Sequence, residues 1–364
     1  MKYYCSKCKR EADITTRQAR CECGGLWKLK FQAPHFQPDL IDRNTWSIFR
    51  YRAFMPLLDE AWQTVSLGEG MTPVISFDED LLLKMDYMMP TLSFKDRGAA
   101  VMISHCKSIG VDCVVQDSSG NAGNSVAAYC ARAGIRCEIF VPEGTSPQKI
   151  AMIRAHGAVV NIVAGSRDHC ADVCREKVER EGMYYASHVY NPFFYEGTKT
   201  YLYEVYEQLH RIPQHIFVPI GNGTLFLGVM KALEDFLEGG LISSMPDVIL
   251  IQSECCKPFI NSMEQNMNTP AEVECQPTLA EGIAIGKPMR GEEILQYIYK
   301  YHVKSISAPE DQILYARNSL ARRGIYCEHT TAAGYAAYMY YCRLYGRPRD
   351  SLLSMCGAGL KSDH

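Results

Sequence analysis

The sequence contains no long apolar run and no strong excess of charge of one sign. No stretch reaches the roughly 18 residues that a membrane-spanning helix needs, and residues 1–5 contain no apolar signal-peptide core. The 38 basic and 41 acidic residues give a net charge of −3, so the chain as a whole does not indicate a polyanionic partner. We therefore expect a cytoplasmic protein that does not enter a membrane.

The sequence also lacks the cysteine spacing of a disulfide framework. Sixteen cysteines are present, but beyond the first four they are scattered along 364 residues, which predicts reduced thiols packed as small apolar side chains. Cys255 and Cys256 are adjacent and are not expected to bond to each other. The length allows two packed domains and a small module, and 47% hydrophobic with 22% charged residues is ordinary for a globular enzyme.

The first four cysteines form a distinct pattern. A C-x2-C pair is followed after twelve residues by a C-x-C pair, and two such pairs can place four thiolates around a tetrahedral zinc ion. Closed four-thiolate sites are usually structural. The sequence therefore predicts a zinc-ribbon module over residues 1–30, with the ligands Cys5, Cys8, Cys21 and Cys23. Two alternatives stay open: free thiols at some of these positions, or a metal other than zinc.

The charge of this module raises a hypothesis of another class. Residues 1–30 contain eight basic and three acidic side chains, an excess that a nucleic-acid-binding zinc ribbon would share. Basic residues around a metal-thiolate centre are equally well explained as charge compensation. The nucleic-acid hypothesis predicts salt-sensitive binding that disappears when residues 1–30 are deleted.

One lysine stands in a setting that favours covalent chemistry. Lys95 follows Leu92 and Phe94, and an amine held against apolar neighbours loses its proton more readily than a hydrated surface lysine. Asp96 and Arg97 are expected to fix the local geometry. The alternative is a helix that starts with a solvated lysine.

Two turns of small residues follow apolar segments and precede helical ones. The first lies between an expected strand at 113–115 and an expected helix at 125–133, and the second follows an expected strand at 216–220. Backbone N–H groups at a helix start bind anions, so the first turn suits an amino-acid carboxylate and the second a phosphate. The second turn is alternatively a plain strand-to-helix connection. Their residues are Ser118, Ser119, Gly120, Asn121 and Ala122, then Gly221, Asn222, Gly223 and Thr224.

Strand and helix signals alternate along the middle of the chain. Strands are expected at 137–141 and 159–163 with a helix at 148–156 between them, and a further strand is expected at 249–252. Alternation of this kind predicts an α/β protein with parallel sheets and right-handed crossovers.

Three motifs together resemble those of the fold type II pyridoxal-phosphate enzymes. They are S-F-K-D-R-G at 93–98, S-S-G-N-A-G at 118–123 and V-P-E-G-T-S-P-Q-K at 141–149, and the four-cysteine module resembles the threonine synthase branch. The resemblance implies a tryptophan synthase β-like fold with two parallel-sheet domains. It implies a large cofactor-binding domain at 31–95 and 196–364, a small mobile domain at 96–195, and pyridoxal 5′-phosphate between them.

The resemblance also implies roles for single residues. Lys95 becomes the catalytic Schiff-base lysine, Asn121 holds the phenolic oxygen of the cofactor, and the turn at 221–224 holds its phosphate. The segment at 356–361 resembles a T-G-x-G-L-K ending in which Cys356 replaces the hydroxyl residue beside the pyridine nitrogen. A thiol is a weaker donor, so the ring nitrogen should stay unprotonated, which suits elimination and replacement chemistry.

The substrate is where this sequence departs from the family pattern. The segment N-P-F-F-Y-E-G-T-K-T at 191–200 has Phe194 where threonine synthases have an arginine for the substrate phosphate. We expect a carbon–oxygen lyase of amino-acid metabolism, foremost a threonine synthase that converts O-phosphohomoserine to threonine and phosphate. A serine, threonine or diaminopropionate ammonia-lyase and a β-replacement synthase remain alternatives. His188, Tyr195, Lys199 or Lys361 would be compensating donors, and a homodimer is one open oligomeric state.

Overall fold

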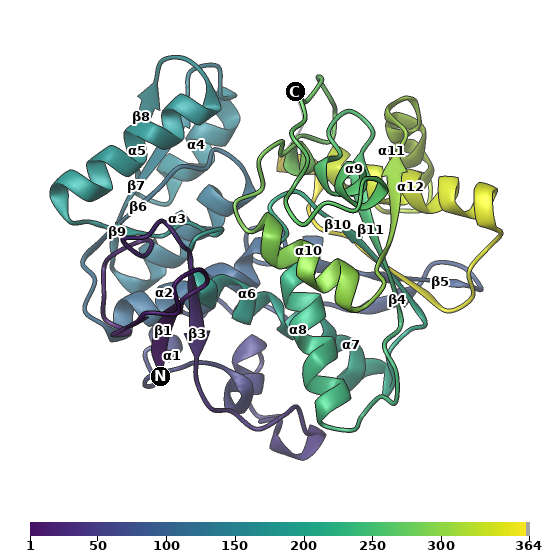
Figure 1. Ribbon diagram of the computed structural model, residues 1–364, viewed down its shortest axis with the longest axis horizontal. Helices are drawn as coiled ribbons and strands as arrows, with labels where there is room; N and C mark the ends of the chain where they lie inside the picture. Colours follow the sequence, from purple (N-terminus) through teal and green to yellow (C-terminus); the bar gives the residue numbers. More distant parts are fainter. Residues whose placement is uncertain (362–364) are drawn as a thin grey trace. The chain divides into compact units, whose positions relative to one another are not determined.

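The computed structural model describes residues 1–361, which form two compact units (Figure 1). The first unit consists of Met1–Met71 and Lys95–Thr200, and the second of Thr72–Phe94 and the chain from Tyr201 onward. Among residues 1–361, no helix combines the length and the apolar character that crossing a bilayer requires.

The second unit is built on a six-stranded sheet. Its order is β12 (Lys304–Ala308), β11 (Asp247–Ser253), β10 (His215–Pro219), β13 (Ser351–Ser354), β5 (Leu81–Lys84) and β4 (Val74–Ser76). The first five strands are parallel and only β4 is antiparallel to its neighbour. The carboxyl ends of five strands therefore lie along one edge of the sheet.

Helices cover this sheet through small and apolar side chains. Ala332, Ala333 and Ala337 of the long helix α12 share a buried cluster with Phe217 and Ile249 of the sheet. Alanine faces let a helix backbone come close to a sheet. The helical segments of this unit are η3 (Asp86–Met88), α7 (Thr200–Leu209), α8 (Thr224–Glu238), α9 (Pro258–Glu264), η4 (Glu281–Ile283), α10 (Gly291–Lys300), η5 (Glu310–Gln312), α11 (Ile313–Ala321), α12 (His329–Tyr345) and η6 (Gly359–Lys361).

The first unit has a smaller sheet in which every pairing is parallel. Its strand order is β8 (Val159–Val163), β7 (Arg136–Pro142), β6 (Cys113–Gln116) and β9 (Tyr184–Tyr185). The strands alternate with helices along the chain, as connections between parallel strands require. The helical segments of the unit are η1 (Pro38–Leu40), η2 (Ile48–Phe54), α1 (Trp62–Val65), α2 (Lys95–Ser108), α3 (Asn121–Ala133), α4 (Pro147–Ala155), α5 (Arg167–Glu181) and α6 (Pro192–Thr198).

The N-terminal thirty residues form a three-stranded antiparallel sheet of their own. Its order is β2 (Glu11–Ala12), β1 (Lys2–Cys5) and β3 (Trp27–Lys30). Tyr3 of β1 lies 6.1 Å from Phe193 of α6 between ring centroids, and its hydroxyl lies 3.4 Å from Nε2 of His105 in α2. The module thus packs against two helices of the first unit.

The predicted α/β architecture with parallel sheets is confirmed. The expected strands at 113–115, 137–141, 159–163, 216–220 and 249–252 correspond to β6, β7, β8, β10 and β11. Helix α2 begins at Lys95, so the lysine lies in its first turn.

Residues 31–71 belong to the first compact unit. Tyr129 donates a hydrogen bond to Glu69 at 2.9 Å, and Ser108 donates one to Asp59 at 2.6 Å. These contacts tie the connecting chain to α3 and α2. The functional division into a large and a small mobile domain stays a prediction.

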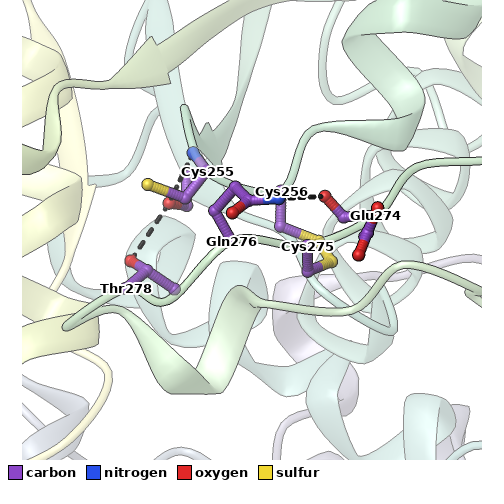
Figure 2. Close-up of a disulfide and its surroundings, with 7 residues drawn as sticks. Cys255, Cys256, Glu274, Cys275, Gln276 and Thr278 are labelled. Atoms are coloured by element: carbon purple, nitrogen blue, oxygen red, sulfur yellow. Dashed lines mark hydrogen bonds between the residues drawn. A yellow bond between two sulfur atoms is a disulfide. The ribbon is translucent and has the colours of Figure 1, made fainter.

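One expectation about the cysteines is wrong. Cys256 and Cys275 form a disulfide in the second unit (Figure 2), whereas the sequence predicts reduced thiols at both positions. The chain after α9 returns alongside Cys256, and the backbone N–H of Gln276 donates to the carbonyl oxygen of Cys255 at 2.9 Å. Cys255 is a free thiol, as expected.

Candidate active site

Lys95 is the first residue of α2, and its two successors anchor that turn. Asp96 accepts a hydrogen bond from the Ser125 hydroxyl at 2.5 Å, and Arg97 donates to the Thr200 hydroxyl at 3.0 Å. Asp96 and Arg97 are fully buried. Because a buried polar side chain without its partner is costly, these bonds restrict the orientation of the turn that carries Lys95.

Helix α6 packs very closely on the start of α2. A Cβ atom on Gly98 would clash with the ring of Phe194, and one on Gly197 would clash with the carbonyl oxygen of Arg97. Only glycine permits such an approach. As a result, the Lys95 amine lies 5.8 Å from the centroid of the Phe194 ring, which is fully buried.

An uncharged imidazole lies beside this ring. His188 and Phe194 are 5.7 Å apart between ring centroids, and Nδ1 of His188 lies 3.5 Å from the side-chain nitrogen of Gln116. Burial, followed by the positive charges of Lys95 and Arg167, lowers the pKa of His188 well below its usual value. The surroundings of the Lys95 amine in the first unit thus include an apolar ring and a neutral imidazole.

The predicted carboxylate turn lies at the amino end of α3. Residues 118–120 follow β6, Gly120 caps the helix, and Asn121 is its first residue. A Cβ atom on Gly123 would clash with the carbonyl oxygen of Ser118, whereas nothing lies within 4 Å of one on Gly120. The tight turn therefore leaves open space at Gly120, where first-turn N–H groups and the helix dipole favour an anion.

The predicted phosphate turn lies at the carboxyl end of β10 in the second unit. Gly223 has a φ of +78° and caps α8, a helix of 15 residues that begins with Thr224. A Cβ atom on Gly223 would clash with Ile294, and one on Gly221 would lie 2.9 Å from the carbonyl oxygen of Gly282. Both positions require glycine, and the resulting turn directs helix N–H groups toward one point, which suits a phosphate group.

Cys356 follows the neighbouring strand β13, at the same edge of the sheet. It is buried, and its thiol lies 3.8 Å from the carbonyl oxygen of Ser354. The backbone N–H of Phe94 donates to the carbonyl oxygen of Cys356 at 3.0 Å. The residue directly before Lys95 is therefore tied to the segment that carries Cys356.

The sequence reasoning missed two residues that hold this segment. The Thr331 hydroxyl accepts from the N–H of Gly357 at 3.0 Å, and the N–H of Glu328 donates to the carbonyl oxygen of Gly357 at 3.0 Å. A Cβ atom on Gly357 would clash with the Glu328 carboxylate. In the sequence, only the glycine at position 357 indicated that another side chain comes close to the backbone there.

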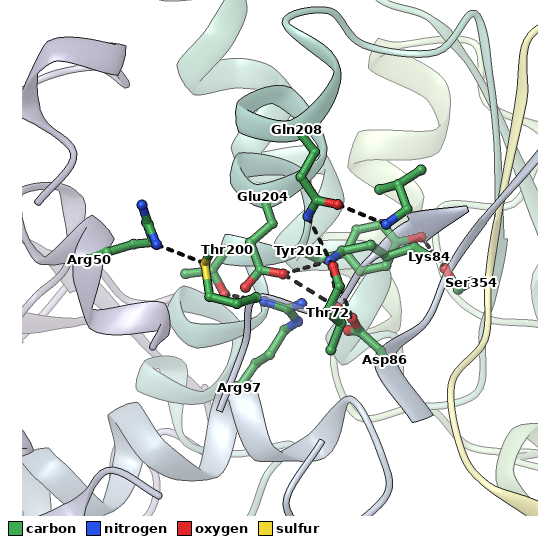
Figure 3. A network of polar contacts seen from close by, with 12 residues as sticks. Arg50, Thr72, Lys84, Asp86, Arg97, Thr200, Tyr201, Glu204, Gln208 and Ser354 are labelled. Atoms are coloured by element: carbon green, nitrogen blue, oxygen red, sulfur yellow. Dashed lines mark hydrogen bonds and ion pairs between the residues drawn. The ribbon is translucent and has the colours of Figure 1, made fainter. Parts of the chain in front are cut away.

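A buried polar network lies under the same sheet edge (Figure 3). Lys84, the last residue of β5, lies 2.6 Å from Glu204 and 3.9 Å from Asp86, and neither the ammonium nor the two carboxylates is exposed. The Thr72 hydroxyl donates to Asp86 at 2.7 Å. Lys84 is also the register partner of Ser354 in β13, so the network supports the strand that leads to Cys356.

The four N-terminal cysteines come together as the sequence predicts, and their sulfur atoms all lie within 4.8 Å of one another. Cys5 and Cys23 approach to 3.4 Å, and Cys8 and Cys21 to 3.6 Å, between sulfur atoms. A tetrahedral zinc ion with bonds of about 2.3 Å would separate its sulfur ligands by about 3.8 Å. A backbone hydrogen bond at Gly25, followed by the neighbouring thiols, lowers the pKa of Cys23 to about 6. The cluster therefore fits a four-coordinate thiophilic metal.

Each unit thus brings its own predicted residues close to one another. In the first unit, the bond between Asp96 and Ser125 joins the first turn of α2, with Lys95, to α3, which begins at Asn121. In the second unit, the turn at 221–224 and Cys356 follow adjacent parallel strands. The roles of these residues in binding and catalysis remain predictions.

Known proteins are similar to this chain in sequence and in fold. The family model described as pyridoxal-phosphate dependent enzyme matches residues 65–357. Threonine synthase from Methanocaldococcus jannaschii is 30% identical over 347 residues, covering 91% of this chain and 85% of the relative. Threonine synthase from Methanosarcina acetivorans is 29% identical and covers 92% and 81%. The structure of the processed form of threonine deaminase isoform 2 from Solanum lycopersicum aligns with a TM-score of 0.72 at 20% identity, covering 90% and 86%.

Proposed function

Because the chain belongs to the family of pyridoxal-phosphate-dependent enzymes, we propose that it is a lyase of the threonine synthase type, with Lys95 as the residue that binds the cofactor. The observation that carries the proposal is the position of Lys95 in the anchored first turn of α2, beside the buried Phe194 ring. The two relatives named threonine synthase, of which this chain covers 85% and 81%, support the reaction type.

The residues of the second unit are assigned to the cofactor. The N–H groups at 221–224 and the Thr224 hydroxyl would hold its phosphate, and Cys356 would be the residue next to its ring nitrogen. The glycine-dependent turn before α8 supports the first assignment, and the place of Cys356 after the neighbouring strand supports the second. When bound, pyridoxal phosphate supplies an electron sink for charge that develops on the α-carbon of an amino acid.

The residues of the first unit are assigned to the substrate and to proton transfer. The turn at 118–122 binds the substrate carboxylate at the amino end of α3, and the Asn121 amide also holds the phenolic oxygen of the cofactor. With cofactor and substrate bound, the Lys95 amine would take the α-proton of the substrate. A leaving group on the β or γ carbon then departs.

The leading substrate is O-phosphohomoserine, with water added after phosphate leaves. The names of the relatives support this choice. A second candidate, an ammonia-lyase or β-replacement synthase that acts on an unphosphorylated amino acid, is favoured by one specific observation. The buried Phe194 ring and the neutral His188 beside Lys95 offer no charge to a phosphate group.

We also assign a structural Zn²⁺ ion to Cys5, Cys8, Cys21 and Cys23, whose convergence supports it. The test is metal analysis of purified protein together with thermal unfolding. About one zinc per chain and lower stability after chelation are expected, because metal binding and folding are coupled at such sites. A Cys8→Ser variant should bind less metal, whereas Cys342→Ser, a change outside the cluster, should not. Equal zinc in all three proteins would contradict the assignment.

The substrate is tested by titrating purified enzyme with O-phosphohomoserine while its visible absorption, phosphate release and threonine formation are followed. A change in the absorption band with release of both products supports the leading substrate. A band that responds only to serine, threonine or diaminopropionate, with ammonia released, supports the second candidate. The absence of any band after cofactor is added contradicts both.

A further inference from the structure

The chain adopts a strained conformation three residues before Lys95. Leu92 has a φ of +61°, in the left-handed region that side chains other than glycine rarely adopt. Its side chain is 38% exposed, so burial of the leucine does not explain why this conformation is kept. Strain of this kind persists only where the surrounding structure holds it in place.

The end of the described chain supplies the contacts that hold Leu92. The Lys361 ammonium donates to the carbonyl oxygens of Thr91 at 3.0 Å and of Leu92 at 2.6 Å. The backbone N–H of Ala358 also donates to the Leu92 carbonyl oxygen at 3.0 Å. An ammonium group carries three donors and can serve two carbonyl groups at once, so Lys361 bridges the two residues of the strained turn.

The same segment also holds the two residues that follow. Ser93 pairs with Gly357 in an isolated antiparallel bridge, and the N–H of Phe94 donates to Cys356. Gly357 is in turn fixed by Thr331. Residues 91–94 are therefore bound along their length to 356–361, and the next residue in the chain is Lys95.

We propose that Lys361 is a positioning residue that holds the strained Thr91–Leu92 turn and thereby sets the direction in which the chain enters α2 at Lys95. The inference rests on the proposed role of Lys95 as the cofactor lysine. It assigns the Lys361 ammonium to backbone carbonyl groups rather than to the substrate phosphate for which it is a candidate by sequence. Loss of the Lys361 ammonium should let the Thr91–Leu92 turn leave this conformation. Glycine at position 92 adopts a positive φ without strain, so the turn should then no longer depend on Lys361.

The test compares Lys361→Met, Leu92→Gly and the double variant with the wild type. Hydrogen exchange of the Phe94 and Ala358 amides, which donate to Cys356 and Leu92, is measured in cofactor-free protein, and the pH midpoint of the visible band is measured in holoenzyme. Lys361→Met should exchange about tenfold faster at these amides and should shift the band midpoint. The double variant should return toward the wild type in both. Lys361→Arg should restore slow exchange, because its guanidinium also donates to carbonyl oxygens.

Lys304→Met is the matched control, because it removes an exposed lysine of the same unit whose partner is Asp247. It should change neither readout. The inference is overturned if Lys361→Met has the same amide exchange rates and the same band midpoint as the wild type. It is also overturned if Lys361→Met changes only the melting temperature, or only the KM for a phosphorylated substrate. Failure of Leu92→Gly to compensate would overturn it as well. A wild-type enzyme without a visible band would refute the proposed function instead, while the exchange experiment on cofactor-free protein would still decide the role of Lys361.

Discussion

Replacement of Lys84 by methionine should be among the most destabilising single changes in the second unit. The Lys84 ammonium lies 2.6 Å from the Glu204 carboxylate and 3.9 Å from that of Asp86, and all three groups are fully buried. Methionine keeps the apolar stem but removes the positive charge. It takes the Lys84 ammonium away from two buried carboxylates, and removal of one partner from a buried ion pair costs about 3–5 kcal/mol.

The expected loss is therefore about 4 kcal/mol in the free energy of unfolding, at the middle of that range. Adding Glu204→Gln to Lys84→Met removes the charge of the carboxylate closest to the lost ammonium, so the double variant should recover about 2 kcal/mol of that loss. Thr72 still donates to Asp86 in both variants. The assay is urea unfolding of cofactor-free protein, with the slope of the transition checked for constancy.

The control for this experiment is Lys304→Met, which removes an ion pair with Asp247 whose side chains are 50% and 43% exposed. Its effect should stay within about 0.5 kcal/mol. If Lys84→Met is as stable as this control, or if the double variant is no more stable than Lys84→Met, the electrostatic account of the network is wrong.

Three further predictions concern other parts of the chain. Gly197→Ala should lower stability by about 3 kcal/mol or more and weaken cofactor binding, because its methyl group meets the Arg97 carbonyl oxygen; wild-type unfolding and cofactor titrations would refute this. Burial lowers the pKa of His105 to about 4, so between about pH 6.5 and 4 the unfolded chain binds a proton that the folded chain does not, and stability falls as pH falls. His105→Phe should lose less stability over this range in urea unfolding at several pH values, and an unchanged pH slope would contradict the assignment. Cys275→Ser should cost about 3 kcal/mol under oxidising conditions, from closure of the loop to Cys256, and almost nothing in reductant; equal stability of both proteins without reductant would exclude the bond.

The parallel strands could be predicted from sequence because they are short apolar runs bounded by turn residues. β8 coincides with such a run at 159–163, and β10 overlaps the run at 216–220 in all but its last residue. β9 consists only of Tyr184 and Tyr185, which is too short to show a period. It forms because β6 offers an open edge beside it, a condition that depends on the rest of the sheet.

The glycine turns could also be predicted, since each follows an apolar strand and precedes a helix. The residues that contact Lys95 and the turn before it could not be predicted, because they are remote from it in the sequence. Phe194 comes into place through the close packing of α6 on α2, and Lys361 contacts Leu92 across 269 positions. Contacts at such separation leave no local periodicity. The disulfide between Cys256 and Cys275 was missed for the same reason, because it depends on how the chain returns after α9.

The most direct test of the central claim is borohydride reduction of purified holoenzyme, followed by digestion and peptide mass analysis. The account predicts that reduced cofactor is attached to the peptide that contains Lys95. It also predicts that Lys95→Ala retains no covalent cofactor, whereas Lys107→Ala, a change at the other end of the same helix, is labelled like the wild type. Attachment at another lysine, or equal labelling of Lys95→Ala, would contradict it.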